Sequence, residues 1–332
     1  MYLFQMKLKN ILIVALFYSL FCQSQTNTQM SENHNPLLCD PEKGICEMPA
    51  TAANSSEKQS FEQQKAVKII YFTDPICSSC WGIEPQLRKL KLEYGSHIEI
   101  EYRMGGLLPD WSYNSGGISK PSDVAHHWDE VSLYYDMPID GDVWLENPLH
   151  SSYPPSIAFK AAQMQDEKKA IQFLRKIREM VFLEKKNICN WEHLAQAAKA
   201  SGLDIQQMQT DYDTKAKKLF EEDLALARQM GVRGFPTIYF IDNFQQFSQL
   251  YGFKPYPHFE DMLLKAFPKA TKKHYDTSWN SLFSQYTTLT AREFSELSNI
   301  SRSESEQILN NLTQDGKLDK WQTKNGSIWK LK

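Results

Sequence analysis

The stretch 67–94 constrains the fold of this chain more than any other part of the sequence. A run of apolar and β-branched residues over 67–72 is typical of a buried strand, and a short Asp-Pro turn ends it. A C-S-S-C motif follows at 77–80, and apolar residues then recur at helical spacing over 83–94. The sequence therefore places two cysteines where a buried strand ends and a helix begins.

This position favours the ionised form of a cysteine. Unpaired backbone N–H groups and the positive end of the helix dipole lower the pKa of a thiol at a helix N-terminus, here Cys77. A cysteine with the usual pKa of about 8.5 is only about 3% thiolate at pH 7, and a decrease of ~1.5 units brings it to about half. Cys80 lies one helical turn away, close enough to form a disulfide. The motif predicts dithiol–disulfide chemistry in which Cys77, as the more exposed thiol, attacks and Cys80 resolves.

Two alternatives compete with a redox-active pair: a metal site and an inert structural pair. A zinc site would need two further Cys or His ligands at short spacing. The nearest candidates, His126 and His127, are adjacent to each other in a different segment. Redox use is therefore favoured, and we expect no metal and no other cofactor.

A second motif supports a family resemblance. The sequence FTDPxCxxCWGxEP around the dithiol, together with GVRGFPT at 231–237, resembles the DsbA-type branch of the thioredoxin superfamily, close to the FrnE-like proteins and the SpxH/YjbH-like adaptors. The resemblance implies an α/β thioredoxin fold over 66–111 and 205–270. A helical insertion over 112–204 would interrupt this fold and cover the active site.

The resemblance also assigns residues around the dithiol. It implies a cis peptide bond before Pro236, which would face Cys77 across the active site. An extended protein substrate would pair with the backbone at Phe235, and Trp81 would help to wall the groove. The dithiol would act on protein thiols and disulfides, and a separate redox partner would recycle it.

One departure from the family affects the expected strength of the dithiol as an oxidant. Ser78 and Ser79 separate the cysteines, where strong oxidants of the family have Pro-His and reductants have Gly-Pro. Their hydroxyls and backbone N–H groups would stabilise the Cys77 thiolate without an imidazolium. We expect a thiol–disulfide oxidoreductase of oxidase or isomerase type, milder than DsbA. The alternative is an adaptor that uses the thioredoxin fold as a binding platform.

The N-terminal segment 1–25 is interpreted as a signal peptide or an N-terminal anchor. Two lysines precede an apolar run over 11–21. This run is shorter than a typical transmembrane helix and has the length of the apolar core of a signal peptide. This predicts a location in the cell envelope or periplasm, where an oxidising environment permits disulfides. Translation from Met30 is the alternative and would leave the chain in the cytoplasm, where a reducing or adaptor role gains weight.

The segment 26–65 reads as a flexible arm that carries a second cysteine pair. Cys39 and Cys46 flank Asp-Pro-Glu-Lys-Gly, a strong turn sequence, so a small disulfide-closed loop is plausible. The pair is interpreted either as a local staple that orders the arm or as an auxiliary disulfide that exchanges with Cys77 and Cys80. The staple is favoured, because nothing nearby activates a thiolate.

The insertion and the segment after it are expected to be mostly helical. Apolar residues at helical spacing predict helices over 124–135, 157–164, 170–183, 191–200 and 205–230. Cys189 is expected to be a buried thiol, with a role as a resolving cysteine as the alternative. Glu99 or Glu101 is a candidate buried acid, although a solvated position is favoured. Most aromatics of the insertion are expected to lie in the core, and the alternative is that they line a substrate groove. The residues concerned are Trp111, Trp128, Tyr134, Tyr135, Trp144 and Tyr153.

Residues 275–332 are predicted to form a small winged-helix-like α+β domain. Capping boxes at Thr290-x-x-Glu293 and Ser301-x-x-Glu304 each open a helix, and Asn-Gly at 325–326 predicts a hairpin turn. Carboxylates on the second helix oppose contact with phosphates, and a net charge of −3 gives the chain no general affinity for nucleic acid. Dimerisation or docking of a partner protein is the expected use.

Overall fold

The computed structural model describes residues 39–40, 45–47, 65–112 and 119–332, which lie in one compact unit. The predicted signal segment 1–25, Met30 and most of the arm 26–65 lie outside the described residues. Within the described ranges, no helix is long and apolar enough to cross a membrane.

A four-stranded sheet forms the centre of the thioredoxin fold, as predicted. Its strand order is β4-β3-β6-β7; β4 runs parallel to β3, whereas β6 and β7 are antiparallel to their neighbours. The strands are β3 (Val67–Thr73), β4 (Ile98–Met104), β6 (Thr237–Ile241) and β7 (Phe247–Tyr251). The apolar run identified in the sequence is thus the central strand β3, which is buried along nearly its whole length.

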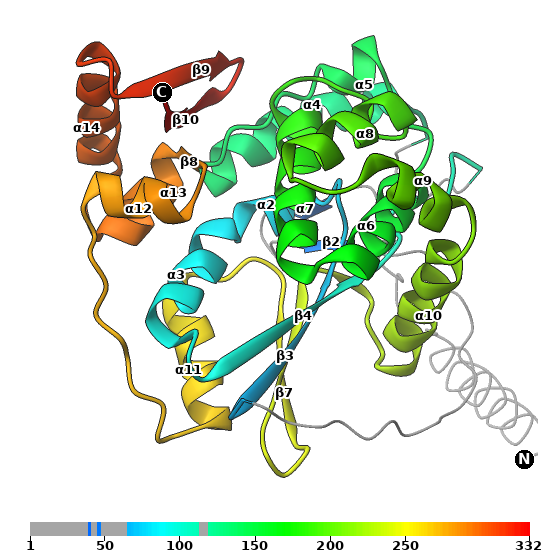
Figure 1. Ribbon diagram of the computed structural model, residues 1–332, viewed down its shortest axis with the longest axis horizontal. Coiled ribbons are helices and arrows are strands. Elements are labelled where there is room, and N and C mark those ends of the chain that lie inside the picture. Colours follow the sequence, from blue (N-terminus) through cyan, green and yellow to red (C-terminus); the bar gives the residue numbers. More distant parts are fainter. Residues whose placement is uncertain (1–38, 41–44, 48–64, 113–118) are drawn as a thin grey trace, which may run out of the picture. The chain divides into compact units, whose positions relative to one another are not determined.

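Helices cover both faces of this sheet. Helices α3 (Glu84–Tyr94) and α11 (Tyr256–Ala266) pack together on one face, and α10 (Ala216–Gln229) contacts β4 from the other (Figure 1). A five-residue helix, α2 (Ser78–Gly82), comes directly after β3 and is separated from α3 by Ile83. Pro85 lies in the first turn of α3, where its missing N–H has no partner to lose.

The insertion contains five helices within the described residues: α4 (Pro121–Tyr135), α5 (Val143–Glu146), α6 (Tyr153–Gln165), α7 (Glu167–Phe182) and α8 (Trp191–Ala200). The single helix predicted over 205–230 was wrong, because the chain forms α9 (Ile205–Asp213) and then α10, with a break at Thr214 and Lys215. Both helices pack against α6, so tertiary contacts set the break that the apolar periodicity did not indicate.

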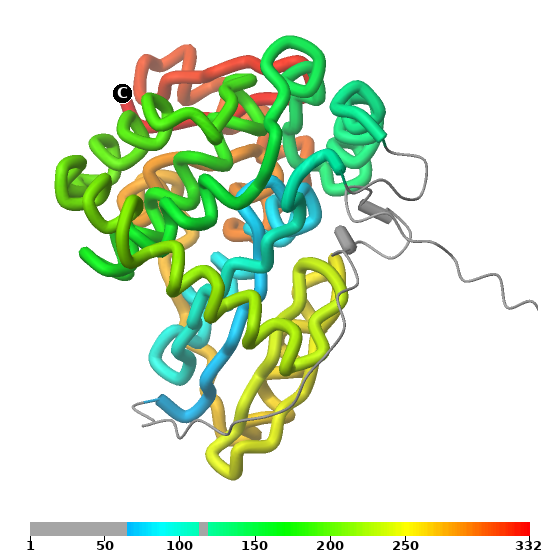
Figure 2. The backbone as a smooth tube through the Cα atoms, turned by 90° about the vertical axis from the view of Figure 1, so that its right-hand side faces the viewer, coloured from blue at the N-terminus to red at the C-terminus, as the bar shows by residue number. Residues whose placement is uncertain are grey.

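The C-terminal domain has a small core of its own, built on Leu289, Phe294, Leu309 and Trp329. Its elements are α12 (Trp279–Gln285), β8 (Thr288–Thr290), α13 (Ala291–Ser298), α14 (Arg302–Gln314), β9 (Leu318–Thr323) and β10 (Gly326–Leu331). The two helices and the hairpin agree with the sequence, which did not predict α12 or β8. In Figure 2 the hairpin lies beside the insertion, to which the Asn325 amide donates a hydrogen bond at Ile139 O (2.8 Å).

A second, smaller sheet joins the N-terminal arm to the thioredoxin domain. Its strands, in spatial order, are β1 (Cys39–Asp40), β2 (Ile45–Glu47) and β5 (Gly234–Phe235), and all pairings are antiparallel. The arm therefore contributes backbone to the region next to Pro236.

Candidate functional site

Cys77 and Cys80 occupy the first turn of α2, as the strand–turn–helix pattern predicts. Cys77 is the N-cap residue in an extended conformation, and its Sγ accepts a hydrogen bond from the Cys80 N–H at 3.2 Å. Both side chains are fully buried, whereas the sequence predicted that Cys77 would be the more exposed. The difference has a physical cause: strand β2 lies against α2 and pairs with β5, so this side of the dithiol is covered.

A buried arginine lies beside the dithiol, and nothing in the sequence indicates its role. The Arg178 guanidinium, on α7, donates to Thr73 Oγ1 at 2.6 Å and to Glu84 Oε1 at 2.6 Å, and it is fully buried. The helical period of α7 was visible in the sequence. The sequence did not indicate which polar residue of α7 would point into the core. A buried arginine needs a charged or polar partner, and the partner of Arg178, Glu84, lies 94 residues away in the chain.

The contacts around the two sulfurs differ, and so do the directions in which their pKa values move. Burial and the hydrogen bond shared with Cys80 raise the pKa of Cys77. Burial also opposes ionisation of Cys80, but the hydrogen bond from Cys77, the charge of Arg178 and the Thr73 hydroxyl outweigh it and lower the Cys80 pKa. In the reduced protein, negative charge is therefore favoured on Cys80. The attacking role of Cys77 stays a prediction.

The buried acid of the site is Asp74, in the turn after β3. Its carboxylate accepts hydrogen bonds from Ile76 N (3.0 Å), Leu107 N (2.8 Å) and Ser152 Oγ (2.9 Å). Burial nevertheless raises the pKa of Asp74 to about 6, since these bonds offset only part of the lost hydration. Glu99 is exposed and Glu101 pairs with Lys68 at 2.6 Å, so neither is the buried acid.

The residues between and after the cysteines are tied into the surrounding core. The hydroxyls of Ser79 and Tyr135 share a hydrogen bond at 2.6 Å, and Ser78 is buried. Trp81 is fully buried, donates from Nε1 to Pro138 O at 3.1 Å and stacks on Phe182. Trp81 thus packs in the core here and does not line an open groove, because the insertion covers it.

The Phe235–Pro236 peptide bond is cis. The Phe235 ring is buried against Gly105, where an added Cβ would lie 1.8 Å from Cζ of the ring. The backbone of Phe235 pairs with Cys46 of β2. The arm of the same chain therefore occupies the strand edge that the family resemblance assigns to an extended substrate. The side chains of Cys39 and Cys46 are not among the described parts of the structure.

Most aromatics of the insertion belong to the core, as predicted: Trp128, Tyr135 and Trp144 are buried. Tyr134 is the exception, half-exposed with its ring packed edge-on against Phe253. Cys189 is partly buried, and its Sγ donates to Ser151 O at 2.9 Å.

A buried ion network fixes the C-terminal domain to the thioredoxin domain. Glu293, at the start of α13, is fully buried and accepts two hydrogen bonds from Arg175 at 2.7 and 3.0 Å. Arg88 of α3 lies 3.3 Å from the same carboxylate, and the Arg175 guanidinium also covers the Trp81 ring at 4.3 Å. Through Arg175, Glu293 therefore links the C-terminal domain to Trp81, the residue that follows the dithiol.

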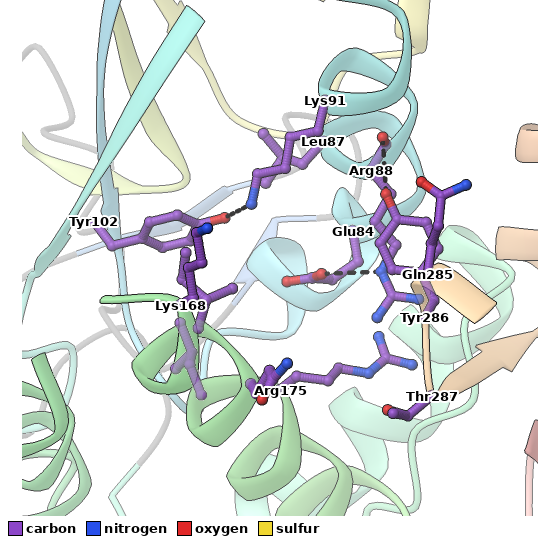
Figure 3. A pocket seen from close by; sticks show the side chains of 13 residues that line it. Glu84, Leu87, Arg88, Lys91, Tyr102, Lys168, Arg175, Gln285, Tyr286 and Thr287 are labelled. Atoms are coloured by element: carbon purple, nitrogen blue, oxygen red, sulfur yellow. Dashed lines mark hydrogen bonds and ion pairs between the residues drawn. The ribbon is translucent and has the colours of Figure 1, made fainter. Parts of the chain in front are cut away.

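A cavity of about 270 Å³ lies next to this network, between α3, α7 and the segment before β8 (Figure 3). Arg88 and Arg175 reach its wall, but neither cysteine of the dithiol lines it. Across the described ranges, no group of three or more His, Cys, Asp or Glu side chains is placed to hold a metal ion.

Comparison with known proteins assigns the family. The thioredoxin family model matches residues 71–261. A ClpXP adapter protein SpxH from Halalkalibacterium halodurans is 32% identical over 307 residues, which cover 91% of this chain and 99% of that protein. The chain belongs to the thioredoxin-fold SpxH family. An SpxH from Shouchella clausii is 33% identical over 299 residues, covering 88% of this chain and 96% of that protein.

Solved structures support the fold independently. A putative protein disulfide isomerase from Nitrosomonas europaea matches with a TM-score of 0.53 at 18% identity, covering 60% of this chain and 97% of that one. This likeness shows the fold alone. The similarity to SpxH proteins, by contrast, extends over nearly the whole chain.

Proposed function

We propose that the chain is a protein-binding adaptor that presents a partner protein to ClpXP. The observation that carries this proposal is the extent of the SpxH relationship, which covers 91% of this chain where the oxidoreductase-like structure covers 60%. A family relationship over almost the full length includes the C-terminal domain, which a dithiol enzyme of the thioredoxin fold does not need.

The geometry supports a docking role for that domain. The buried Glu293–Arg175 pair holds it on the thioredoxin domain, so the two form one continuous surface. The hairpin exposes Trp321, with 55% of its surface accessible, on the edge strand β9. Large exposed aromatics of this kind contribute strongly to protein interfaces.

Turnover in the cell tests the adaptor proposal. A client should accumulate when the chain is deleted, and should reach the same level when ClpXP is inactivated or when both are absent. Quantitative mass spectrometry of the four strains measures this. The Cys77→Ala/Cys80→Ala variant should restore turnover, because docking does not require thiol chemistry. If no protein responds to loss of the chain, the proposal is wrong.

A surface variant locates the docking site. Trp321→Ala should slow client turnover by about tenfold, the effect of losing a hot-spot aromatic worth roughly 1.4 kcal/mol or more. Phe244→Ala is the matched control, since Phe244 is also exposed but lies in the turn between β6 and β7. Equal effects of the two variants would remove the hairpin from the interface.

A second candidate function is thiol–disulfide oxidoreductase acting on protein thiols. The arrangement of Cys77 at the N-cap, with Arg178 beside the dithiol, favours it. In insulin reduction or ribonuclease refolding, Cys77→Ser should abolish activity, whereas Cys189→Ser should leave it unchanged. A Cys77→Ser variant as active as the wild type would exclude this function.

The two candidates suit different compartments, and only the oxidoreductase requires a particular reduction potential. Signal cleavage within 1–25 would place the dithiol in the envelope, where a potential above about −180 mV suits an oxidant or isomerase. A start at Met30 suits the adaptor, and a potential near about −270 mV would match a thioredoxin-like reductant. N-terminal sequencing of the protein from cells, with equilibration against glutathione, separates these cases.

A further inference from the structure

The arm places its cysteine pair at the edge of the dithiol site. In the sheet β1-β2-β5, strand β2 lies in the middle, and Cys46 is the residue that pairs with Phe235. Phe235 immediately precedes Pro236, and β2 also lies against α2, the helix that Cys77 caps. The strand that carries Cys46 thus contacts both elements that carry the active-site motifs.

The register also relates the two arm cysteines to each other. Cys39 and Cys46 are directly opposed partners in the β1–β2 pair. Opposed residues of antiparallel strands have Cα atoms roughly 4.5–5.5 Å apart, within the range of roughly 4.4–6.8 Å that a disulfide spans. Cys39, on the outer strand, is farther from β5 than Cys46 by one strand spacing of about 4.8 Å. The backbone therefore distinguishes a proximal cysteine from a distal one.

We propose that Cys39 and Cys46 form a second redox pair that exchanges disulfides with Cys77 and Cys80 through Cys46. In one direction, the Cys46 thiolate attacks Cys77 Sγ; the Cys46–Cys77 bond forms, the Cys77–Cys80 bond breaks, and Cys80 leaves as the thiolate. Cys39 then attacks Cys46 Sγ, and Cys77 leaves. Two electrons and two protons pass from the arm to the active-site pair, and the reverse exchange follows the same steps.

The surroundings of Cys80 suit its part in this exchange. The leaving sulfur of a disulfide departs faster when its thiol is more acidic. The Thr73 hydroxyl and the charge of Arg178 stabilise negative charge on Cys80. Cys46 pairs with Phe235 on the substrate edge of β5, so both cysteine pairs belong to the same molecule and lie near each other. The exchange therefore needs no second protein, whether the chain is an adaptor or an oxidoreductase.

Trapping the mixed disulfide tests the proposed exchange. The variant Cys39→Ser/Cys80→Ser keeps the proximal arm cysteine and Cys77, and Cys46→Ser/Cys80→Ser is the matched control that keeps the distal one. After incubation of each full-length variant with oxidised glutathione, mass spectrometry of non-reduced peptides measures the linkage to Cys77. We expect Cys46–Cys77 in at least tenfold excess over Cys39–Cys77. Equal yields, as from a freely moving arm, or no linkage in either variant would overturn the proposal.

An experiment on the wild-type chain guards against effects of the substitutions. The starting material is full-length protein that holds a single disulfide, formed between Cys77 and Cys80. Part of this protein should convert to the form whose single disulfide joins Cys39 and Cys46. The rate should be the same at 1 and 50 μM, because the exchange is intramolecular. A rate proportional to concentration, or no redistribution, would show that the arm pair is only a local staple.

Discussion

Arg178 and Asp74 set the chemistry of the dithiol site, and their charges have opposite effects on the two thiols. The Arg178 guanidinium favours negative charge on Cys80, whereas the Asp74 carboxylate raises the pKa of Cys77 when it is ionised. Both side chains are buried, so water screens their charges little. The acidity of the pair therefore depends on two residues that belong to neither cysteine's own helix.

Removing the arginine should make the dithiol less acidic. We expect Glu84→Gln/Arg178→Met, which removes both charges of the buried pair, to lower the thiolate population of the reduced protein at pH 7 by about tenfold, the effect of losing about 1.4 kcal/mol of charge stabilisation. Thiolate absorbance at 240 nm against pH measures it. Arg178→Lys keeps the charge and should lie close to the wild type; a loss as large as in the double variant would mean that packing, rather than charge, is responsible.

Asp74 should make the stability of the protein depend on pH. The folded chain holds a proton on Asp74 up to a pKa of about 6, while the unfolded chain releases it near 3.8. The unfolding free energy of the wild type should therefore fall by about 3 kcal/mol from this group as pH rises from well below 3.8 to well above 6. Urea unfolding at several pH values, with Asp74→Asn as reference, isolates this contribution. A constant difference between the two proteins would contradict it.

At the scale of elements, the end of β4 and strand β5 must approach closely. Gly105 follows β4, and the Phe235 ring occupies the space that a Cβ on Gly105 would need. This contact joins the central sheet to the strand that carries the substrate edge. A glycine is therefore required here for close packing.

The contact can be tested as a coupled pair. Gly105→Ala should lower the unfolding free energy by about 1–3 kcal/mol through overpacking. Phe235→Ala alone should cost about 3–5 kcal/mol, and the combined variant should lose less than the sum, because removing the ring makes room for the added methyl. Denaturant unfolding of the wild type, the two single variants and the combined variant gives the four unfolding free energies of this double-mutant cycle. Strict additivity would show that the ring and Gly105 do not compete for space.

At the scale of the whole molecule, the C-terminal domain and the thioredoxin domain should unfold together. The buried carboxylate of Glu293 is paired with Arg88 of the thioredoxin domain and with Arg175 of the helical insertion in that domain. Its capping box with Thr290 also begins α13, so one side chain stabilises both the helix and the interface. The second predicted capping box is incomplete: Ser301 accepts the Glu304 N–H, but no reciprocal bond forms.

Breaking this pair should separate the two domains. Glu293→Gln leaves buried arginines without a full partner and should cost about 3–5 kcal/mol. Glu306→Gln removes an exposed ion pair with Arg302 and should change stability by no more than about 0.5 kcal/mol. Tryptophan fluorescence in urea and limited proteolysis after residue 267 measure both. A Glu293→Gln protein that still unfolds in one unchanged transition would show that apolar packing alone joins the domains.

The sequence by itself determined the central strand, the dithiol at a helix start, the thioredoxin fold, and the two helices and hairpin of the C-terminal domain. These features depend on local patterns: apolar periodicity, turn residues and caps that act within a few positions of each other. Tertiary structure alone decided which polar residues surround the dithiol, because Arg178, Asp74 and Glu293 are buried only where partners distant in the chain satisfy their charge. It also decided that the arm strand β2 covers the substrate edge, since strand pairing is a contact between backbones that no local pattern encodes.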